Sequence, residues 1–236
     1  MISYQHSLAF NGFAIVPFLY TAAEIQAILS CISQADSSRE TFRKTSDLFA
    51  IRQFLKEVPE VLPLLLNDRF KSLLQQAIGH NCFVVKSIYF DKPAASNWYV
   101  SYHQDLTISV NQKAALPGFG PWTVKTNQFA VQPPLPYLEN ITTLRIHLDD
   151  TTAANGALKV IPGSHAKGIY RPETINRDTE TEVHCEVPAG GAMLMKPLLL
   201  HSSGRTTNQR QRRVLHIEFA SMQLPDPLAW SEKLSL

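Results

Sequence analysis

Hydrophobic and polar positions follow a helical period in the first third of this chain. Apolar side chains recur every three to four residues over 21–35 and 67–78, which predicts two amphipathic helices, the first with a capping box at its start. A third helix is expected between them, over 46–57, and a short strand at 13–19 precedes all three. The N-terminal third is therefore predicted to be largely helical.

From residue 82 onward the pattern changes to short β-branched and aromatic runs separated by proline, glycine and asparagine. Helices followed by many strands favour a mostly β fold with helices packed on one face over a parallel α/β fold. Residues 109–136 keep no period and are rich in glycine and proline, which predicts a lid or wall of an active site, with a plain surface loop as the alternative. The predicted strands are 82–91, 99–108, 142–148, 157–161, 182–187, 192–195 and 212–220.

Composition narrows the class of protein. The 236 residues are 44% hydrophobic, enough for one core, so we expect a single domain over 1–236, helical at about 20–80 and barrel-like at about 82–220. A net charge of +2 does not indicate nucleic-acid binding. Three well-separated cysteines predict reduced thiols in a cytoplasmic protein. Because no run is long enough to span a bilayer, no membrane partner is expected, and the oligomeric state is open.

A candidate metal site lies in the strand predicted at 99–108. His103 and Asp105 are two residues apart, so they would project from the same face of that strand. His201 follows a largely apolar run and supplies a second imidazole. Two histidines and one carboxylate make the facial triad of non-haem Fe(II) oxygenases, which leaves coordination positions open for co-substrate and O2. Taken singly, the pair is as typical of a partly exposed strand as of a metal site, and His201 is more typical of a core histidine. A turn expected at Ser202-Ser203-Gly204, together with Arg212, favours His201 as a ligand.

A candidate partner for an anionic co-substrate, Arg212, lies eleven residues after His201. Arg212 opens the strand predicted at 212–220, and its planar guanidinium can pair bidentately with a carboxylate. 2-Oxoglutarate carries two carboxylates: one chelates iron together with the keto oxygen, and the other needs a cation. Arg212 and Arg213 point to opposite faces of the strand, so only one of them can enter the pocket. The order His-x-Asp, His, Arg fits this requirement.

The combination resembles the phytanoyl-CoA dioxygenase family of Fe(II)/2-oxoglutarate oxygenases. The resemblance implies a double-stranded β-helix (jelly-roll, cupin-like) barrel in which His103, Asp105 and His201 are the catalytic iron ligands and Arg212 anchors 2-oxoglutarate. It also implies that Gln104, Trp122 and Ser203 line the co-substrate pocket. The stretches that carry it are Tyr102-His103-Gln104-Asp105-Leu106, Leu144-Arg145-Ile146-His147-Leu148-Asp149-Asp150, Asn155-Gly156-Ala157-Leu158 with Pro162-Gly163-Ser164-His165, and His201 to Arg212.

The resemblance further implies a dioxygenase that hydroxylates an unactivated C–H bond of a small organic molecule, using O2 and converting 2-oxoglutarate to succinate and CO2. Lys86, Arg145 and Lys125 are candidate substrate contacts, and the substrate would be anionic if they face the cavity. Asp105 argues against a halogenase, whose iron keeps that position free for halide. Two alternatives remain: a cupin-type metal-binding barrel or non-redox metalloenzyme without 2-oxoglutarate, and a degenerate barrel that acts as a binding module.

Overall fold

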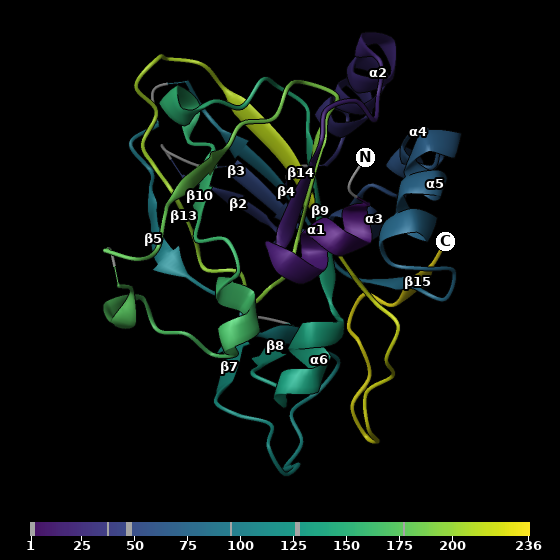
Figure 1. The fold of residues 1–236 in the computed structure, drawn as a ribbon. Coiled ribbons are helices and arrows are strands. Elements are labelled where there is room, and N and C mark those ends of the chain that lie inside the picture. The colour runs from purple at the N-terminus through teal and green to yellow at the C-terminus, as the bar shows by residue number, and fades with distance from the viewer. Residues whose placement is uncertain (1–2, 37, 46–48, 95, 126–127, 177) are drawn as a thin grey trace.

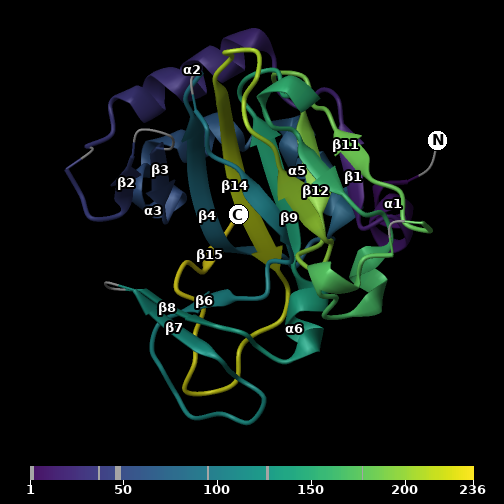
Figure 2. The ribbon, with the colours of Figure 1, turned by 90° about the vertical axis from the view of Figure 1, so that its left-hand side faces the viewer.

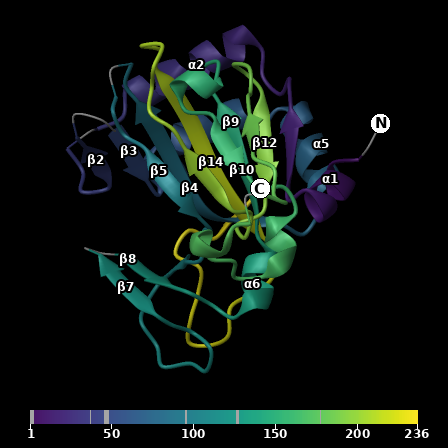
Figure 3. The same cartoon turned by 60° about the vertical axis from the view of Figure 1, so that its left-hand side comes forward.

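The computed structural model describes residues 3–36, 38–45, 49–94, 96–125, 128–176 and 178–236. Within these residues the chain forms two antiparallel sheets that enclose a common interior, with a smaller third sheet at one end (Figure 1). Figure 1 shows three layers in sequence: the small sheet, the large sheet, and the helices on the far side of the large sheet. Figure 3 shows the small sheet in front of the large one.

Hydrogen bonding between neighbouring strands defines each sheet within the described residues. The large sheet has the order β1 (Phe13–Val16), β12 (Ala192–Met195), β9 (Thr142–His147), β14 (Arg212–Ala220), β4 (Phe83–Lys92), β3 (Phe49–Arg52) and β2 (Phe42–Lys44), and β15 (Leu234–Ser235) also pairs with β4. The small sheet has the order β11 (Val183–Cys185), β10 (Leu158–Val160), β13 (His201–Ser203) and β5 (Val100–His103). The third has the order β6 (Ile108–Val110), β8 (Gln128–Val131) and β7 (Trp122–Lys125).

The chain crosses repeatedly from one large layer to the other. It passes from β4 to β5, from β9 to β10 and β11, back to β12, then to β13 and again to β14. All of these pairings are antiparallel. Two facing sheets connected in this way form a jelly roll, so the predicted fold class is confirmed.

Helices cover the outer face of the large sheet (Figure 2). The capping box predicted for the first long helix is present, because the Thr21 hydroxyl accepts from Glu24 N at 3.2 Å and the Glu24 carboxylate accepts from Thr21 N at 2.6 Å. No helix in the described part of the chain combines the length and apolar character needed to cross a bilayer. The helices on this face are α1 (Tyr4–Phe10), α2 (Ala22–Ser33), α3 (Phe54–Glu57), α4 (Leu62–Leu65) and α5 (Asp68–Ala77). A sixth, α6 (Leu135–Asn140), lies instead beside the third sheet (Figure 1).

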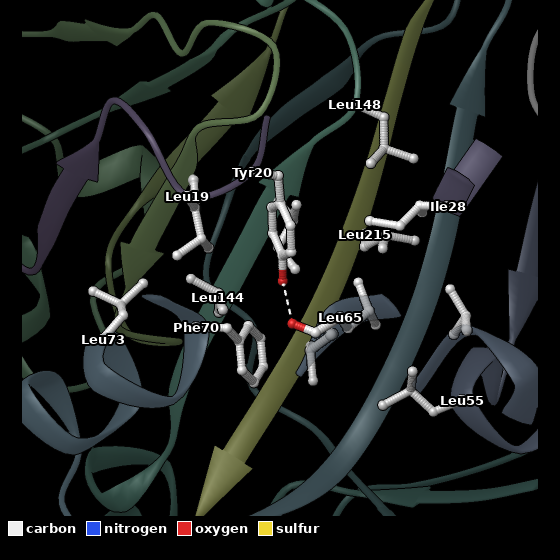
Figure 4. Close-up of a cluster of buried hydrophobic side chains, with 14 of the residues drawn as sticks. Leu19, Tyr20, Ile28, Leu55, Leu65, Phe70, Leu73, Leu144, Leu148 and Leu215 are labelled. Atoms are coloured by element: carbon white, nitrogen blue, oxygen red, sulfur yellow. Dashed lines mark hydrogen bonds between the residues drawn. The ribbon is translucent and has the colours of Figure 1, made fainter. Parts of the chain in front are cut away.

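The main hydrophobic core lies between these helices and the large sheet (Figure 4). Leu144 and Leu215 from neighbouring strands meet Ile28 of α2 and Phe70 of α5, and each is at most 1% exposed. Burying a side chain of this size stabilises the fold by roughly 1.5–3 kcal/mol. Because successive strand residues point to opposite faces, the alternate residues of the same strands face the small sheet, where the candidate site lies.

The helix predicted over 46–57 is wrong for most of its length. Residues 49–52 form β3, which pairs with β4 in the register Ile51 to Tyr89, and only 54–57 are helical; residues 46–48 lie outside the described part. The run Phe49-Ala50-Ile51 is too short for its period to separate strand from helix. Residues 49–52 form a strand because the edge of β4 supplies hydrogen-bond partners for their backbone.

Three further expectations are corrected by the pairing. The strand predicted at 99–108 is divided, since β5 ends at His103 and β6 begins at Ile108. The loop predicted at 109–136 contains β7 and β8, which pair with each other, and the first turn of α6. Ser202 and Ser203, expected in a turn after His201, belong to β13, which pairs with both β10 and β5.

Candidate metal centre

The two candidate histidines lie directly opposite each other on neighbouring strands. His201 of β13 pairs with His103 of β5, and their ring centroids are 4.2 Å apart. Asp105 follows where the chain has left β5, and its backbone N–H donates to the Pro197 carbonyl at 2.9 Å. Its two carboxylate oxygens lie 3.8 Å from the Nε2 atoms of His103 and His201. One ligand atom from each of the three residues lies within 4.8 Å of the others.

Backbone carbonyls fix the tautomer of both histidines. His103 Nδ1 lies 2.8 Å from the Ser101 carbonyl, and His201 Nδ1 lies 2.8 Å from the Leu199 carbonyl. Because a carbonyl only accepts, each Nδ1 carries the proton and each Nε2 presents its lone pair toward Asp105. Metal-binding histidines use the same arrangement, in which a hydrogen bond at one nitrogen orients the other toward the metal.

The ionisation of these groups also suits a divalent cation. Burial lowers the pKa of His201 to about 4, so its imidazole is neutral at physiological pH. Burial alone would raise the pKa of Asp105, but electrostatic interaction with the neighbouring His201 and with the Lys86 ammonium brings that pKa well below its usual range. A neutral imidazole and an ionised carboxylate are the forms that bind metal. The donor set therefore fits Fe(II) held by two nitrogens and one oxygen.

The triad borders a cavity of about 230 Å³ between the two sheets. Arg212 lines the same cavity and is only 4% exposed. Its Nε and Nη1 have no hydrogen-bond partner among the described residues. Burial, with a smaller contribution from the nearby Arg145 guanidinium, lowers the pKa of Arg212 to about 9, which still leaves it charged at pH 7. A buried cation without a protein partner favours an anionic ligand.

Arg213, the neighbour of Arg212, faces away from this cavity. Its Nε and Nη2 donate to the two carboxylate oxygens of Asp149 at 2.8 and 2.6 Å. Neither Arg213 nor Asp149 lines the cavity of the triad. Of the two adjacent arginines, the structure brings only Arg212 to the candidate metal centre.

A chain of buried polar side chains crosses the inner face of the large sheet beside the triad. Arg145 Nη1 lies 2.9 Å from His216 Nδ1, His216 Nε2 lies 3.0 Å from Glu218 Oε1, and Lys86 Nζ donates to the same oxygen at 2.9 Å. An arginine only donates, so His216 accepts at Nδ1 and donates from Nε2. Asp105, His216 and Glu218 also lie close enough to share a metal, but both His216 nitrogens are already used in this chain. The geometry therefore favours the triad with His103 and His201.

Of the residues predicted to line the co-substrate pocket besides Arg212, only Ser203 borders this cavity. Ser203 lines the cavity, and its Oγ donates to the Gly156 carbonyl at 2.9 Å. Gln104 does not: its Nε2 donates to the carbonyls of residues 168 and 198, and its Oε1 accepts from Tyr170 N. Trp122 packs instead against the apolar cluster beside the third sheet. Lys125 ends β7, and its side chain lies outside the described part of the structure.

The other two candidate substrate contacts, Lys86 and Arg145, do line the cavity. Glu218 and His216, which hold them, were not predicted as site residues. The alternation along 212–220 contains the signal, because residues 212, 214, 216 and 218 share one face of the strand. A lysine turned inward needs an anionic partner, and Glu218 is the acidic residue on that face.

Fold and site together define a jelly-roll barrel in which two histidines and one carboxylate lie beside a cavity lined by a buried arginine. Residues 9–214 match the family model described as phytanoyl-CoA dioxygenase (PhyH). The chain therefore belongs to the phytanoyl-CoA dioxygenase family, a family of Fe(II)/2-oxoglutarate-dependent dioxygenases.

Individual relatives agree with the family match. A probable alpha-ketoglutarate-dependent hypophosphite dioxygenase from Stutzerimonas stutzeri is 24% identical over 246 residues, covering 89% of this chain and 75% of that protein. The iron/alpha-ketoglutarate-dependent dioxygenase ausU from Aspergillus calidoustus is 36% identical over 97 residues, covering 39% of this chain and only 31% of that protein. The non-heme alpha ketoglutarate dependent carbocyclase SnoK from nogalamycin biosynthesis superimposes with a TM-score of 0.69 at 15% identity, covering 97% and 85% of the two chains, and so supports the fold.

Proposed function

We propose that this protein is an Fe(II)/2-oxoglutarate-dependent dioxygenase that hydroxylates an unactivated C–H bond of a small organic substrate. In the balanced reaction, R–H, O2 and 2-oxoglutarate give R–OH, succinate and CO2, one oxygen atom entering each of the alcohol and succinate. One observation carries the proposal: three metal-ligand atoms within 4.8 Å of one another share a cavity with the unpaired guanidinium of Arg212.

The three metal-binding candidates and Arg212 each have a defined part in this proposal. His103, Asp105 and His201 would hold the iron, which when bound supplies the reduction of O2 and the oxidation of the substrate. Arg212 would bind the distal carboxylate of 2-oxoglutarate and so set the orientation of the co-substrate. Its Nε and Nη1 have no hydrogen-bond partner among the described residues, so both remain able to donate to a ligand.

The walls of the cavity strengthen these interactions. Ile88, Phe90 and Val100 line it together with the charged groups. Apolar walls exclude water, and charges attract each other more strongly where water is excluded. His216 is held at both nitrogens, so it forms a fixed polar floor between Arg145 and Glu218 and does not act as a mobile base.

Two observations support a small substrate that carries an anionic group. Arg145 adds positive charge to the wall beside the triad, whereas the charge of Lys86 is matched there by Glu218. The relative from Stutzerimonas stutzeri is named for hypophosphite, a small inorganic anion. We therefore propose a small metabolite with a carboxylate or an equivalent anion.

Anaerobic titration tests the proposal directly. Purified protein loaded with one equivalent of Fe(II) should develop a weak visible charge-transfer band when 2-oxoglutarate is added. His103→Ala and His201→Ala should lose the band while circular dichroism shows the parent fold, because these side chains border a cavity and not the packed core. His184→Ala, an exposed histidine on the same small sheet, is the matched control and should keep the band.

Two results would count against this function. Folded parent protein that binds Fe(II) but gives no band with 2-oxoglutarate would favour the cupin-type metal barrel. Protein that binds no Fe(II) at all would favour a degenerate barrel with a binding role.

A further inference from the structure

A second cavity, of about 240 Å³, adjoins the one that holds the triad. Lys86 and Ile88 line both cavities, so the two share a wall on β4. Thr107, two residues after Asp105, also lines the second cavity and places it beside the candidate metal centre. The rest of the lining comes from the end of β3, from the third sheet and from the C-terminal segment.

The charged side chains of this second cavity are incompletely balanced. Lys86 is matched by Glu218, whose Oε1 accepts from Lys86 Nζ at 2.9 Å. Arg52 has no ion-pair partner for its guanidinium in the part of the chain that the structure describes. Glu232 is 8% exposed, and its Oε2 accepts from the N–H and the hydroxyl of Ser87 at 2.9 and 2.6 Å. Its Oε1 is buried and has no hydrogen-bond partner among the described residues.

An unmatched carboxylate oxygen in a protein interior is unfavourable unless a donor reaches it. Glu232 responds in the expected direction, because burial raises its pKa to about 7 in the absence of such a donor. Arg52, which is partly buried, offers the complementary group, a guanidinium that accepts no hydrogen bond and can donate to an anion. The cavity therefore has one unfilled position for a donor and one for an acceptor.

The backbone beside Arg52 has an uncommon conformation. Gln53 also lines the cavity and has φ +52°, in the left-handed region that side chains other than glycine, asparagine and aspartate rarely adopt. A residue held there costs roughly 1–2 kcal/mol relative to ordinary backbone. Such residues cluster at ligand sites, where surrounding structure maintains them. At this position the chain ends β3 and places Arg52 and Gln53 on the cavity wall.

Volume limits what the cavity can hold. Pockets for drug-sized ligands are roughly 300–1,000 Å³, so a cavity of about 240 Å³ suits a molecule with few heavy atoms. A nucleotide thioester would exceed it.

We propose that this second cavity is the substrate pocket and that it takes a small zwitterion of the amino-acid type. The ammonium group pairs with Glu232 Oε1, and the carboxylate pairs with Arg52, with the spare Lys86 donors beside it. A simple anion would leave Glu232 unmatched, and a simple amine would leave Arg52 unmatched. The inference rests on the proposed function, because the carbon that is oxidised must extend from this cavity past Lys86 and Ile88 to the metal centre.

Anaerobic calorimetry tests the ligand class without turnover. The Fe(II)·2-oxoglutarate enzyme is titrated with each of the common L-amino acids, and each is compared with its N-acetyl derivative and its decarboxylated amine. We expect at least one zwitterion to bind and both of its derivatives to bind at least tenfold more weakly. The inference is overturned if none of the zwitterions binds, or if an N-acetyl derivative binds as well as its parent.

Variants separate binding from a structural role. Glu232→Gln and Arg52→Gln should each raise the dissociation constant of the zwitterion at least tenfold and leave that of 2-oxoglutarate unchanged. Glu186→Gln is the control, because Glu186 also accepts from a backbone N–H, that of Ala153 at 2.9 Å, but lines neither cavity. If Glu232 only supports the fold, its variant lowers the melting temperature and leaves zwitterion binding intact, which contradicts the inference.

The two proposals fail in distinguishable ways. If the parent protein gives no charge-transfer band with 2-oxoglutarate, the proposed function is wrong and the inference fails with it. A normal band without zwitterion binding removes the inference alone.

Discussion

Replacing each of the two adjacent arginines of β14 by methionine should affect a different property, co-substrate binding in one case and stability in the other. Methionine keeps most of the length of the side chain and removes its charge. Arg212 faces the cavity of the triad, and its Nε and Nη1 have no hydrogen-bond partner in the described part of the chain, whereas Arg213 donates to both carboxylate oxygens of Asp149. Arg212→Met should therefore weaken the binding of 2-oxoglutarate, and Arg213→Met should weaken the fold.

The structure sets the size of both effects. Losing one member of a buried, hydrogen-bonded charge pair costs about 2–5 kcal/mol, which at about 1.4 kcal/mol per decade is a rise of roughly thirty-fold to a few thousand-fold in the dissociation constant of 2-oxoglutarate for Arg212→Met. In the free protein the same change relieves repulsion from Arg145, so the free energy of unfolding should not fall through lost pairing. Arg213→Met leaves Asp149 partly unmatched; because both side chains are partly exposed, the loss should be about 1–2 kcal/mol.

Two measurements on each variant test whether Arg212 affects co-substrate binding and Arg213 affects stability. The charge-transfer band, followed against 2-oxoglutarate concentration, gives the co-substrate constant, and urea unfolding gives the stability. Fe(II) affinity should stay near that of the parent in both variants, because no metal ligand is changed. The reasoning fails if Arg213→Met is the variant that weakens 2-oxoglutarate binding, or if both variants change the co-substrate constant alike.

Three further changes test other parts of the molecule. Hydrogen bonds from Thr21, with help from Arg69, lower the pKa of Glu24 to about 2, so its contribution is present above pH 4.5 and lost as pH falls toward 2. Glu24→Gln should therefore cost about 1–2 kcal/mol by urea unfolding at pH 7 and nothing near pH 2. Arg145→Met should weaken 2-oxoglutarate binding about tenfold, less than Arg212→Met, in the band titration. Gln104→Ala should cost about 3 kcal/mol through three lost hydrogen bonds and leave the co-substrate constant unchanged.

The alternation of apolar and polar residues along single strands accounts for much of what the sequence predicts correctly about which side chains face the helices. The pattern of 142–148 separates Leu144 and Ile146 from Thr143 and Arg145, and the structure places the first pair against the helices and the second inside the barrel. This alternation alone is compatible with a polar set that faces either solvent or the interior. That choice depends on the small sheet, which covers this face and is made of strands distant in sequence.

Pairing between distant strands is the part that local pattern could not supply. His201 lies opposite His103 because β13 and β5 are neighbours, and nothing within either segment specifies that register. The same applies to β3, whose strand conformation comes from the edge of β4. Asp105 was expected on the same strand as His103, yet its N–H bonds to Pro197 outside the ladder while its carboxylate still faces both imidazoles.

Charge balance inside the barrel determines which groups remain available to ligands. Burying a charge is costly unless it is paired, so the inner face of the large sheet joins Lys86 and Glu218 and holds His216 between Glu218 and Arg145. Lys86, His216 and Glu218 satisfy one another and keep the floor of the cavity fixed, whereas Arg145 Nε has no hydrogen-bond partner among the described residues. Arg212 is left without such a partner, and so, in the adjoining cavity, is one oxygen of Glu232. We therefore expect the unmatched groups, and not the total number of charges, to define the chemistry of the two ligands proposed for this barrel.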